Sequence, residues 1–353
     1  MYKRVLKKIV VLLCIWAIYA GTTEGLRYLI VDDTFSYTRL TLHEMYESES
    51  NIDILFVGAS LVYRSLIPGV ADDYFDAYTF NLGTSNQQMD ASLVLIKEAL
   101  MYHDVKQIYL EVSYDIALLE DNKDRTQMTG TYIVSDYLRP SLRKVIYLLR
   151  ASSPEHYANS FILARRNPEK LFDYAYIKEL VKKKQDISYR NYECEWIRSK
   201  DAIDYYVDRG FVANDTIYED SPENLSEFEP IDLSAISEDW KYYLNEIIDF
   251  CQKKGIQLTL FSAPKPKITL TGKGNYDEYY VYIKGIAEEK GVPYYDFNLC
   301  RPQYFDSNDM ACFKDGTHLN ANGAQKFTEV FAAFFTGEIK EEELFYSSYR
   351  EVN

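Results

Sequence analysis

Short apolar segments recur along the chain, and each is followed by residues that favour turns. The first, Ile52 to Gly58, reads IDILFVG, and four others have the same design at residues 77–83, 107–113, 256–264 and 292–297. A short continuous apolar run bounded by turn residues is typical of a strand that is buried on both faces of a parallel sheet. We therefore predict five such strands.

Helical periodicity fills most of the gaps between these strands. Apolar residues recur at spacings of three and four over residues 89–102, 240–254, 276–290 and 323–335. Gly255 and Gly291 each follow a lysine-rich segment end, which predicts two helix C-caps. Strands that alternate with helices predict an α/β fold, a three-layer doubly wound sheet of about five parallel strands with right-handed crossovers.

The alternation of strands and helices stops between about Glu120 and Glu238. An insertion therefore separates the third predicted strand from the fourth. The predicted organisation is an N-terminal membrane segment and linker at 1–31, an α/β domain built from 45–119 and 236–340, a mainly helical insertion or cap subdomain at 120–235, and a C-terminal tail at 341–353.

The N-terminus pairs a basic start with an apolar run. Four of the first eight residues are lysine or arginine, and Ile9 to Ala20 is unbroken apolar sequence. That run is shorter than the roughly 20 residues of a full span, but Val5 to Gly25 makes a plausible single anchor. A signal peptide cleaved after Ala20 would place Ile18 where a small residue is expected. We expect an uncleaved anchor in the cell membrane with the body outside; a cleaved signal and a buried helix remain alternatives.

Charge is unevenly distributed. The chain has 39 basic and 54 acidic residues, a formal net charge of −15, which argues against a general nucleic-acid binder because phosphate contact needs a basic face. Within the insertion, residues 139–184 hold 11 basic and 4 acidic residues, whereas 193–239 hold 3 basic and 14 acidic ones. The basic half could lie on the membrane, cover the active site as a lid, or form a solvated helical cap.

Cysteine spacing gives no sign of a metal centre. The five cysteines form no CxxC pair or Cys/His cluster, so neither a zinc site nor any other metal or cofactor is expected. Cys300 and Cys312 are close enough in sequence to pair, Cys194 and Cys251 allow other connectivities, and unpaired core cysteines are equally consistent with the sequence.

The candidate chemistry begins with a serine directly after the first predicted strand, in Gly58-Ala59-Ser60. Ligands of open α/β sheets lie outside the carboxyl ends of the strands, so Ser60 is a candidate nucleophile. Asp315 and His318 lie three residues apart in a glycine-containing turn before the last predicted helix. At that spacing Asp315 can hold one imidazole nitrogen while the other takes the Ser60 proton. Each residue alone is ordinary, but together they predict a catalytic triad.

These blocks resemble those of the SGNH (GDSL-type) hydrolases. Ser60 matches the nucleophile of the first block, Gly83 in NLGTSN matches the glycine of the second, and Asp315 with His318 matches the last. The anchor and the stretches TFNLGTSNQQ, IYLEVS, LFSAPKP and DGTHLNANGAQKF are similar to the DltD-like, membrane-anchored branch of bacterial cell-envelope proteins. The resemblance implies a flavodoxin-like sheet and the O-acylation of surface polymers.

The resemblance also implies an oxyanion hole, from which this sequence departs. Family members use the serine N–H, the N–H of the second-block glycine and an asparagine from a Gly-x-Asn-Asp block. Here Gly83 supplies the glycine, but the third strand ends LEVSYD without asparagine. Asn86 or Gln87 is the candidate replacement. A missing donor costs about 3 kcal/mol of transition-state stabilisation.

The expected function is therefore a serine esterase or O-acyltransferase that works through an acyl-Ser60 intermediate. Its expected substrate is a cell-envelope polysaccharide or teichoic acid-like polymer, and a multispanning membrane O-acyltransferase is a possible partner. The alternative is a non-catalytic protein of the same fold that binds glycans or scaffolds such an acyltransferase. Among 33 tyrosines, four in the insertion are candidates either to line a sugar cleft or to fill the core: Tyr192, Tyr205, Tyr206 and Tyr218.

Overall fold

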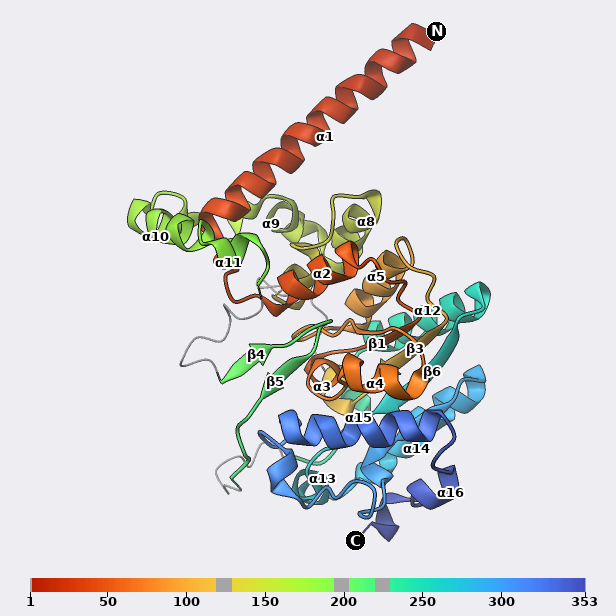
Figure 1. Cartoon of the computed structure of the whole chain (residues 1–353). Coiled ribbons are helices and arrows are strands. Elements are labelled where there is room, and N and C mark those ends of the chain that lie inside the picture. The colour runs from red at the N-terminus through yellow and green to blue at the C-terminus, as the bar shows by residue number, and fades with distance from the viewer. Residues whose placement is uncertain (1, 119–128, 194–202, 220–228, 353) are drawn as a thin grey trace.

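A five-stranded parallel sheet forms the centre of the protein in a computed structural model that describes residues 2–118, 129–193, 203–219 and 229–352. The spatial order of the strands is β2-β1-β3-β6-β7, and every neighbouring pair is parallel (Figure 1). Each strand lies within one of the predicted apolar runs, so the predicted α/β class is confirmed. The strands are β1 (Ile54–Val57), β2 (Thr79–Asn81), β3 (Gln107–Glu111), β6 (Gln257–Ser262) and β7 (Tyr294–Asp296).

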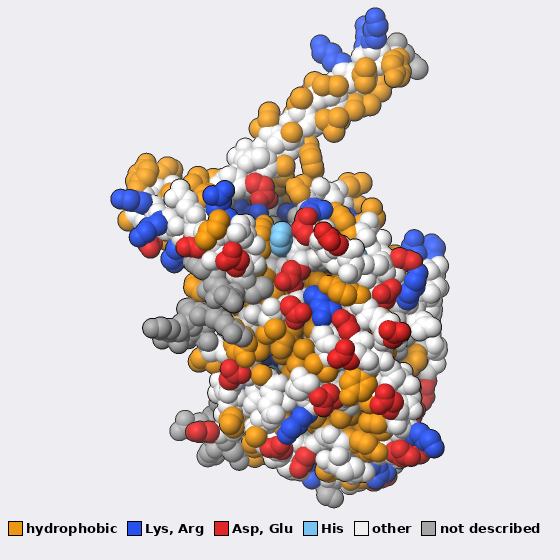
Figure 2. All heavy atoms as spheres, in the orientation of Figure 1, with side chains coloured by type: hydrophobic (Ala, Val, Ile, Leu, Met, Phe, Trp, Pro, Cys, Tyr) orange, Lys and Arg blue, Asp and Glu red, His pale blue; other side chains and the backbone are white. Residues whose placement is uncertain are grey.

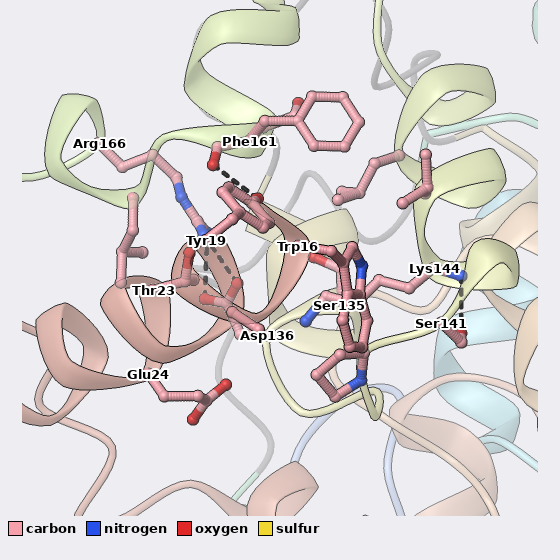
Figure 3. A pocket seen from close by; sticks show the side chains of 16 residues that line it. Trp16, Tyr19, Thr23, Glu24, Ser135, Asp136, Ser141, Lys144, Phe161 and Arg166 are labelled. Atoms are coloured by element: carbon pink, nitrogen blue, oxygen red, sulfur yellow. Dashed lines mark hydrogen bonds and ion pairs between the residues drawn. The ribbon is translucent and has the colours of Figure 1, made fainter. Parts of the chain in front are cut away.

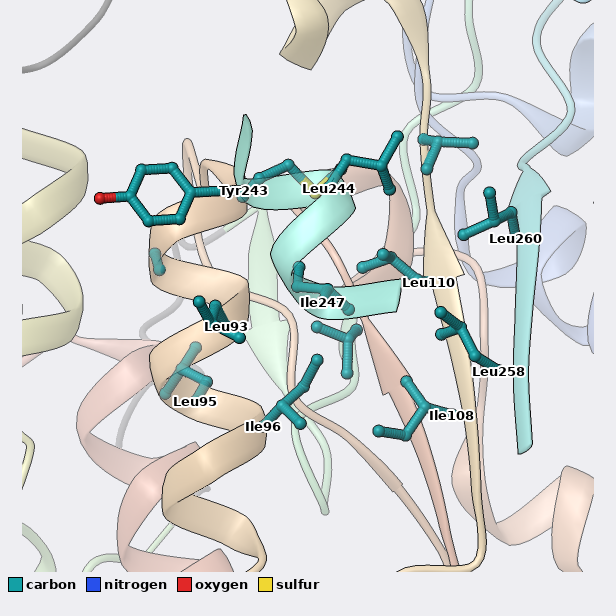
Figure 4. Packing of buried hydrophobic residues seen from close by; sticks show 14 of the residues in the cluster. Leu93, Leu95, Ile96, Ile108, Leu110, Tyr243, Leu244, Ile247, Leu258 and Leu260 are labelled. Carbon is teal, nitrogen blue, oxygen red and sulfur yellow. The ribbon is translucent and has the colours of Figure 1, made fainter. Parts of the chain in front are cut away.

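Helices cover both faces of this sheet because successive side chains of a strand point to opposite sides. On one face Leu55 and Ile108 belong to a cluster that includes Ile247 (Figure 4). On the other face Phe56 packs edge-to-face on Phe331, with ring centroids 5.9 Å apart. The first face is covered by α5 (Met89–Ala99), α12 (Glu238–Lys254) and α14 (Tyr276–Lys290), and the second by α4 (Pro68–Phe75) and α15 (Ala321–Phe335).

Local sequence sets where the long helices begin and end. The Ser237 hydroxyl accepts a hydrogen bond from the Trp240 N–H and caps the start of α12. Gly255 and Gly291 follow α12 and α14 with φ of +70° and +65°, so both predicted C-caps are confirmed. The shorter helices of the α/β domain are α2 (Tyr37–Glu47), α3 (Ser60–Tyr63), α6 (Tyr114–Ala117), α13 (Lys267–Lys273) and α16 (Glu341–Leu344).

The N-terminal helix α1 (Tyr2–Ile30) projects from the body (Figure 1). An 18-residue window within it has a mean hydropathy of 1.8 and no residue buried inside the protein. The helix is therefore long and apolar enough to cross a membrane, in agreement with the predicted single anchor. A 29-residue helix rises about 44 Å, which exceeds the hydrocarbon thickness of a bilayer.

The insertion has two different halves. Its first half is helical, as predicted, and its described residues lie around the base of α1 and away from α3 (Figure 1). Its second half contains an antiparallel hairpin that the sequence analysis did not anticipate. The elements are α7 (Thr129–Ser135), α8 (Leu142–Ala151), α9 (Tyr157–Phe161), α10 (Tyr174–Lys184) and α11 (Ile187–Arg190), then β4 (Asp204–Tyr206) and β5 (Val212–Asn214).

Cysteines and tyrosines mostly serve packing. The four cysteines within the described residues, Cys14, Cys251, Cys300 and Cys312, are free thiols. Cys300 and Cys312 therefore do not pair, and Cys194 lies outside those residues.

Of the four candidate sugar-lining tyrosines, Tyr206 and Tyr218 are buried. The ring of Tyr192 stacks on that of His43, with the ring centroids 3.5 Å apart. Tyr205 is half-buried and donates a hydrogen bond to Asp215.

Residues 341–352, predicted as a tail, pack on the α/β domain. Leu344 is fully buried, and its carbonyl accepts a hydrogen bond from the Arg301 N–H at 2.8 Å. Cys300 and Phe345 form an antiparallel bridge. The last segment therefore contributes to the core beside β7.

Candidate active site

Ser60 is positioned by a tight turn at the carboxyl end of β1. Gly58, two residues before it, has a φ of +156°, and a Cβ there would lie 2.5 Å from Val62 Cγ2 and 2.9 Å from Glu111 Cβ. Only glycine fits so close an approach of two elements. Ser60 then begins the short helix α3, where it remains partly exposed beside the sheet edge.

His318 and Asp315 lie in a small closed loop just before α15. Phe313 and Leu319 form an antiparallel bridge at its base, and the Lys314 N–H donates to the His318 carbonyl at 3.0 Å. Asn320 caps α15 and also donates to the carbonyls of Ala311 and Phe313. Together with the Thr317 and His318 N–H groups, which donate to Asp315 Oδ1, these contacts hold the loop backbone in place.

The two segments meet as the sequence predicts. Ser60 Oγ lies 2.8 Å from His318 Nε2, although the residues are 258 positions apart. His318 Nδ1 lies 3.0 Å from each carboxylate oxygen of Asp315. A proton on Nδ1, shared with Asp315, leaves Nε2 free to accept the serine proton. The Ser60–His318–Asp315 arrangement has the geometry of a nucleophile, a base and an orienting group.

Asp315 is held ionised in this arrangement. Burial alone would raise its pKa, but the hydrogen bond and charge of His318 and the backbone N–H groups of Thr317 and His318 outweigh burial and lower the pKa well below its usual value. Asp315 therefore stays charged through mildly acidic conditions and can stabilise an imidazolium.

Gly83 lies beside the serine turn, as the second block of the resemblance implies. A Cβ at Gly83 would lie 3.1 Å from the Ala59 carbonyl oxygen and from the Tyr63 nitrogen. Its N–H, however, donates to Asn81 Oδ1 at 3.1 Å. An oxyanion at Ser60 would have to compete with that side chain for the Gly83 N–H, so the predicted donor role stays a prediction.

The two candidates for the missing third donor differ. Asn86 is exposed and has a φ of +50°, and its role remains a prediction. Gln87 is buried: its Oε1 accepts from Thr84, and its Nε2 donates to Ser92. One of its two amide N–H groups thus bonds to Ser92 on α5, and a role for Gln87 as an oxyanion donor stays a prediction.

Glu111 is a buried acid at the carboxyl end of β3 that sequence reasoning passed over. It is 1% exposed, and neither carboxyl oxygen makes a hydrogen bond of normal geometry within the described residues. Burial raises its pKa to about 7, against the opposing effects of Ser113 and Lys265. Glu111 lies close to the serine turn, because a Cβ added at Gly58 would be 2.9 Å from Glu111 Cβ. The sequence showed only an acid where the family pattern has asparagine.

A second charged pair lies near the imidazole. Lys265, buried after β6, forms an ion pair with Asp115 on α6. Burial would raise the pKa of Asp115, but Lys265, Lys273 and His318 lower it. The influence of His318 on Asp115 indicates that this pair borders the site, as does the hydrogen bond from Thr269 on α13 to the Gly316 carbonyl. Neither residue was a candidate at the sequence level.

The acidic half of the insertion contacts both the segment that carries Ser60 and the loop that carries His318. Arg64, which follows α3, donates to both oxygens of Asp204 on β4, at 2.9 and 2.6 Å. Lys314, next to Asp315, approaches the same carboxylate at 3.8 Å. Asp204 thus connects the serine segment to the histidine loop. Gly210, in the hairpin turn, packs so closely on β2 that a Cβ would lie 1.7 Å from the Asn81 carbonyl oxygen.

Comparison with known proteins adds no assignment. No protein-family model matches the chain. No curated protein matches it significantly either. The functional interpretation therefore depends on the residues and their geometry. Within the described residues, no group of three or more His, Cys, Asp or Glu side chains is placed to hold a metal ion.

Proposed function

We propose that this protein is a membrane-anchored, extracytoplasmic serine esterase or O-acyltransferase of SGNH type. Its substrate would be an acyl ester of a cell-envelope glycan or teichoic acid-like polymer. The observation that carries the proposal is the continuous contact from Ser60 through His318 to Asp315 at 2.8 and 3.0 Å. Support for the location comes from α1 and the basic residues that precede its apolar run, which favour a cytoplasmic N-terminus.

The chemistry follows from that contact. As Ser60 Oγ attacks the ester carbonyl carbon, His318 Nε2 takes the serine proton and then gives it to the leaving alcohol oxygen. This leaves an acyl-Ser60 ester. Water or a polymer hydroxyl then attacks the acyl carbon and passes its proton to His318, which returns it to Ser60. Asp315 holds the ring and stabilises its charged form at both steps.

The alternative is a non-catalytic glycan-binding or scaffolding partner of a multispanning membrane O-acyltransferase. One observation favours it: the N–H of Gly83, the expected oxyanion donor, is engaged by Asn81. A site without that donor would still hold a reactive serine but would turn over slowly. Reactivity of Ser60 together with turnover separates the two functions.

The test uses the full chain in lipid nanodiscs, treated with a fluorophosphonate. We expect labelling of the wild type and none of Ser60→Ala. Ser65→Ala is the matched control, because Ser65 lies on the same segment and its buried hydroxyl makes no hydrogen bond to any residue that the structure describes. Equal labelling of Ser60→Ala, or no labelling of the wild type, would contradict the catalytic proposal. Adding a glycan acceptor to the acylated protein then distinguishes transfer, which yields acylated sugar, from hydrolysis, which yields free acid.

A further inference from the structure

The helical half of the insertion lies beside the apolar part of α1, not merely below it. The Tyr19 hydroxyl on α1 donates to the carbonyl of Phe161, the last residue of α9, at 2.8 Å. Trp16 and Tyr19 also line a pocket together with Val145 of α8, and in Figure 3 both aromatic side chains extend from α1 towards this half of the insertion. The insertion therefore reaches the level of Trp16 along α1.

That level is inside the apolar run. The run ends at Ala20, and an α-helix rises 1.5 Å per residue, so α8 and α9 overlap with about the last 6 Å of the run. If α1 spans a bilayer, these helices lie at the depth of the lipid headgroups and the first acyl carbons. Interfacial helices bury their apolar faces to a similar depth of about 5–10 Å.

The side chains at this depth suit such a position. The buried side of α8 carries Tyr147 and Leu148, whereas its outer side exposes apolar residues at spacings of four and three. Figure 2 shows hydrophobic side chains on the protein surface to either side of the base of α1. Within residues 139–184, the large exposed apolar side chains are Leu142, Ile146, Leu149, Ile162, Phe172 and Tyr174, of which Phe172 and Tyr174 are 78% and 79% exposed.

The charge of this half of the insertion indicates which kind of membrane surface it would bind. Residues 139–184, which contain all of these side chains, carry 11 basic and 4 acidic residues. Lys178 and Lys182 are exposed on α10, next to Phe172 and Tyr174 in sequence. Basic side chains close to a bilayer are attracted by anionic lipid headgroups. The excess of basic residues in this segment therefore favours contact with an anionic membrane surface.

α10 is also fixed to α1. Lys184, fully buried, donates to the carbonyls of Arg27 and Val31 and pairs with Asp33 at 2.7 Å. The Tyr176 hydroxyl donates to the Ile30 carbonyl at 3.2 Å. These bonds connect the insertion to the base of the anchor, so the orientation of α1 determines the orientation of the body.

We propose that α8, α9 with Ile162, and the start of α10 form a platform that inserts into the interface of an anionic bilayer beside α1. The platform fixes the height and tilt of the α/β domain above the membrane. The proposal requires α1 to span a bilayer and is independent of the chemistry proposed at Ser60.

The experiment uses the full chain in nanodiscs with a photoreactive phenylalanine analogue at Phe172 or Ile162. The control position is Val281, which is 64% exposed. It belongs to α14, and Figure 1 shows α14 in the lower part of the body, far from α1. We expect crosslinking to lipid from Phe172 and Ile162 at least about fivefold above Val281, because interfacial side chains contact acyl chains directly. Lipid yields equal to that of Val281, or crosslinks to a second protein copy instead of lipid, would overturn the proposal.

A charge reversal tests the choice of lipid. Lys178→Glu/Lys182→Glu should lower the lipid crosslinking yield at Phe172 several-fold in anionic nanodiscs and leave it unchanged in zwitterionic ones. Lys284→Glu/Lys340→Glu, a matched pair of exposed lysines on the distant part of the domain, should change neither. An undiminished yield from the Lys178/Lys182 variant in anionic nanodiscs would contradict the proposed attraction to anionic lipid.

Discussion

The two halves of the insertion contact different parts of the molecule. The basic half, with α8 to α10, packs on the base of α1, whereas the acidic half, with β4 and β5, packs on the loops that carry Ser60 and His318. Each half takes part in an arginine–aspartate pair with two hydrogen bonds: Arg166 pairs with Asp136 inside the helical half, and Asp204 of the acidic half pairs with Arg64, which follows α3. One connection between two strands therefore contacts both the base of α1 and the loops that carry Ser60 and His318, and its charge is divided accordingly.

The largest effect is expected from a substitution that disturbs the packing of the acidic half and leaves the helical half intact. Gly210→Ala places a Cβ where the Asn81 carbonyl oxygen lies, at a φ of +84°, so the free energy of unfolding should fall by about 2–5 kcal/mol. Ester turnover should fall more than tenfold while lipid crosslinking from Phe172 persists. Chemical denaturation and the two assays measure this.

Gly274→Ala is the control for backbone strain. Gly274 has a φ of +76° but open space around it, so its substitution should cost only about 1–2 kcal/mol. If Gly210→Ala is no more destabilising than Gly274→Ala, the hairpin does not pack on β2 as described.

Glu111 should contribute to the pH dependence of the free energy of unfolding. The pKa of Glu111 is raised to about 7 from a usual 4.5, so the neutral acid is favoured in the folded protein. Its contribution to stability is fully present below pH 4.5 and is lost as the pH rises to about 7. The loss is on the order of 3 kcal/mol. Glu111→Gln should remove this slope in denaturation measured across pH.

A stability slope between pH 4.5 and 7 that is unchanged in Glu111→Gln would contradict the assignment to Glu111.

The smallest effects are expected from two substitutions that each remove the carboxylate of one ion pair, Arg64–Asp204 or Arg166–Asp136. Asp204→Asn removes the charge opposite Arg64 and should lower ester kcat/KM about tenfold, with lipid crosslinking unchanged. Asp136→Asn removes the charge opposite Arg166 and should lower lipid crosslinking from Phe172, with kcat/KM unchanged. Melting temperatures of the two variants check that general destabilisation is similar. A parallel loss of both activities in either variant would remove the distinction between the halves.

The parallel strands and the approach of Ser60 to His318 could both be predicted from the sequence, for physical reasons. Continuous apolar runs such as Ile54–Val57 have one stable environment, the middle of a parallel sheet. Carboxyl ends of parallel strands share one edge, so Ser60 could be expected to approach a residue placed like His318.

The missed features depend on packing across distant segments. β4 and β5 have three residues each and no clear alternation, so their local signal is weak. Glu111 looks like a solvated residue at a strand end, because its burial arises from Gly58 and the elements around it. The role of Asp204 appears only once Arg64 and Lys314 are brought together.

The most direct test of the proposed chemistry is peptide-resolved acylation of the full chain by an activated acetyl ester in nanodiscs. We predict acetyl groups on Ser60 in the wild type and in Asp136→Asn, a strongly reduced yield in His318→Ala, and none at that position in Ser60→Ala. Acylation of Ser60 that is equally fast in His318→Ala, or acylation confined to other residues, would contradict a catalytic Ser60–His318–Asp315 site.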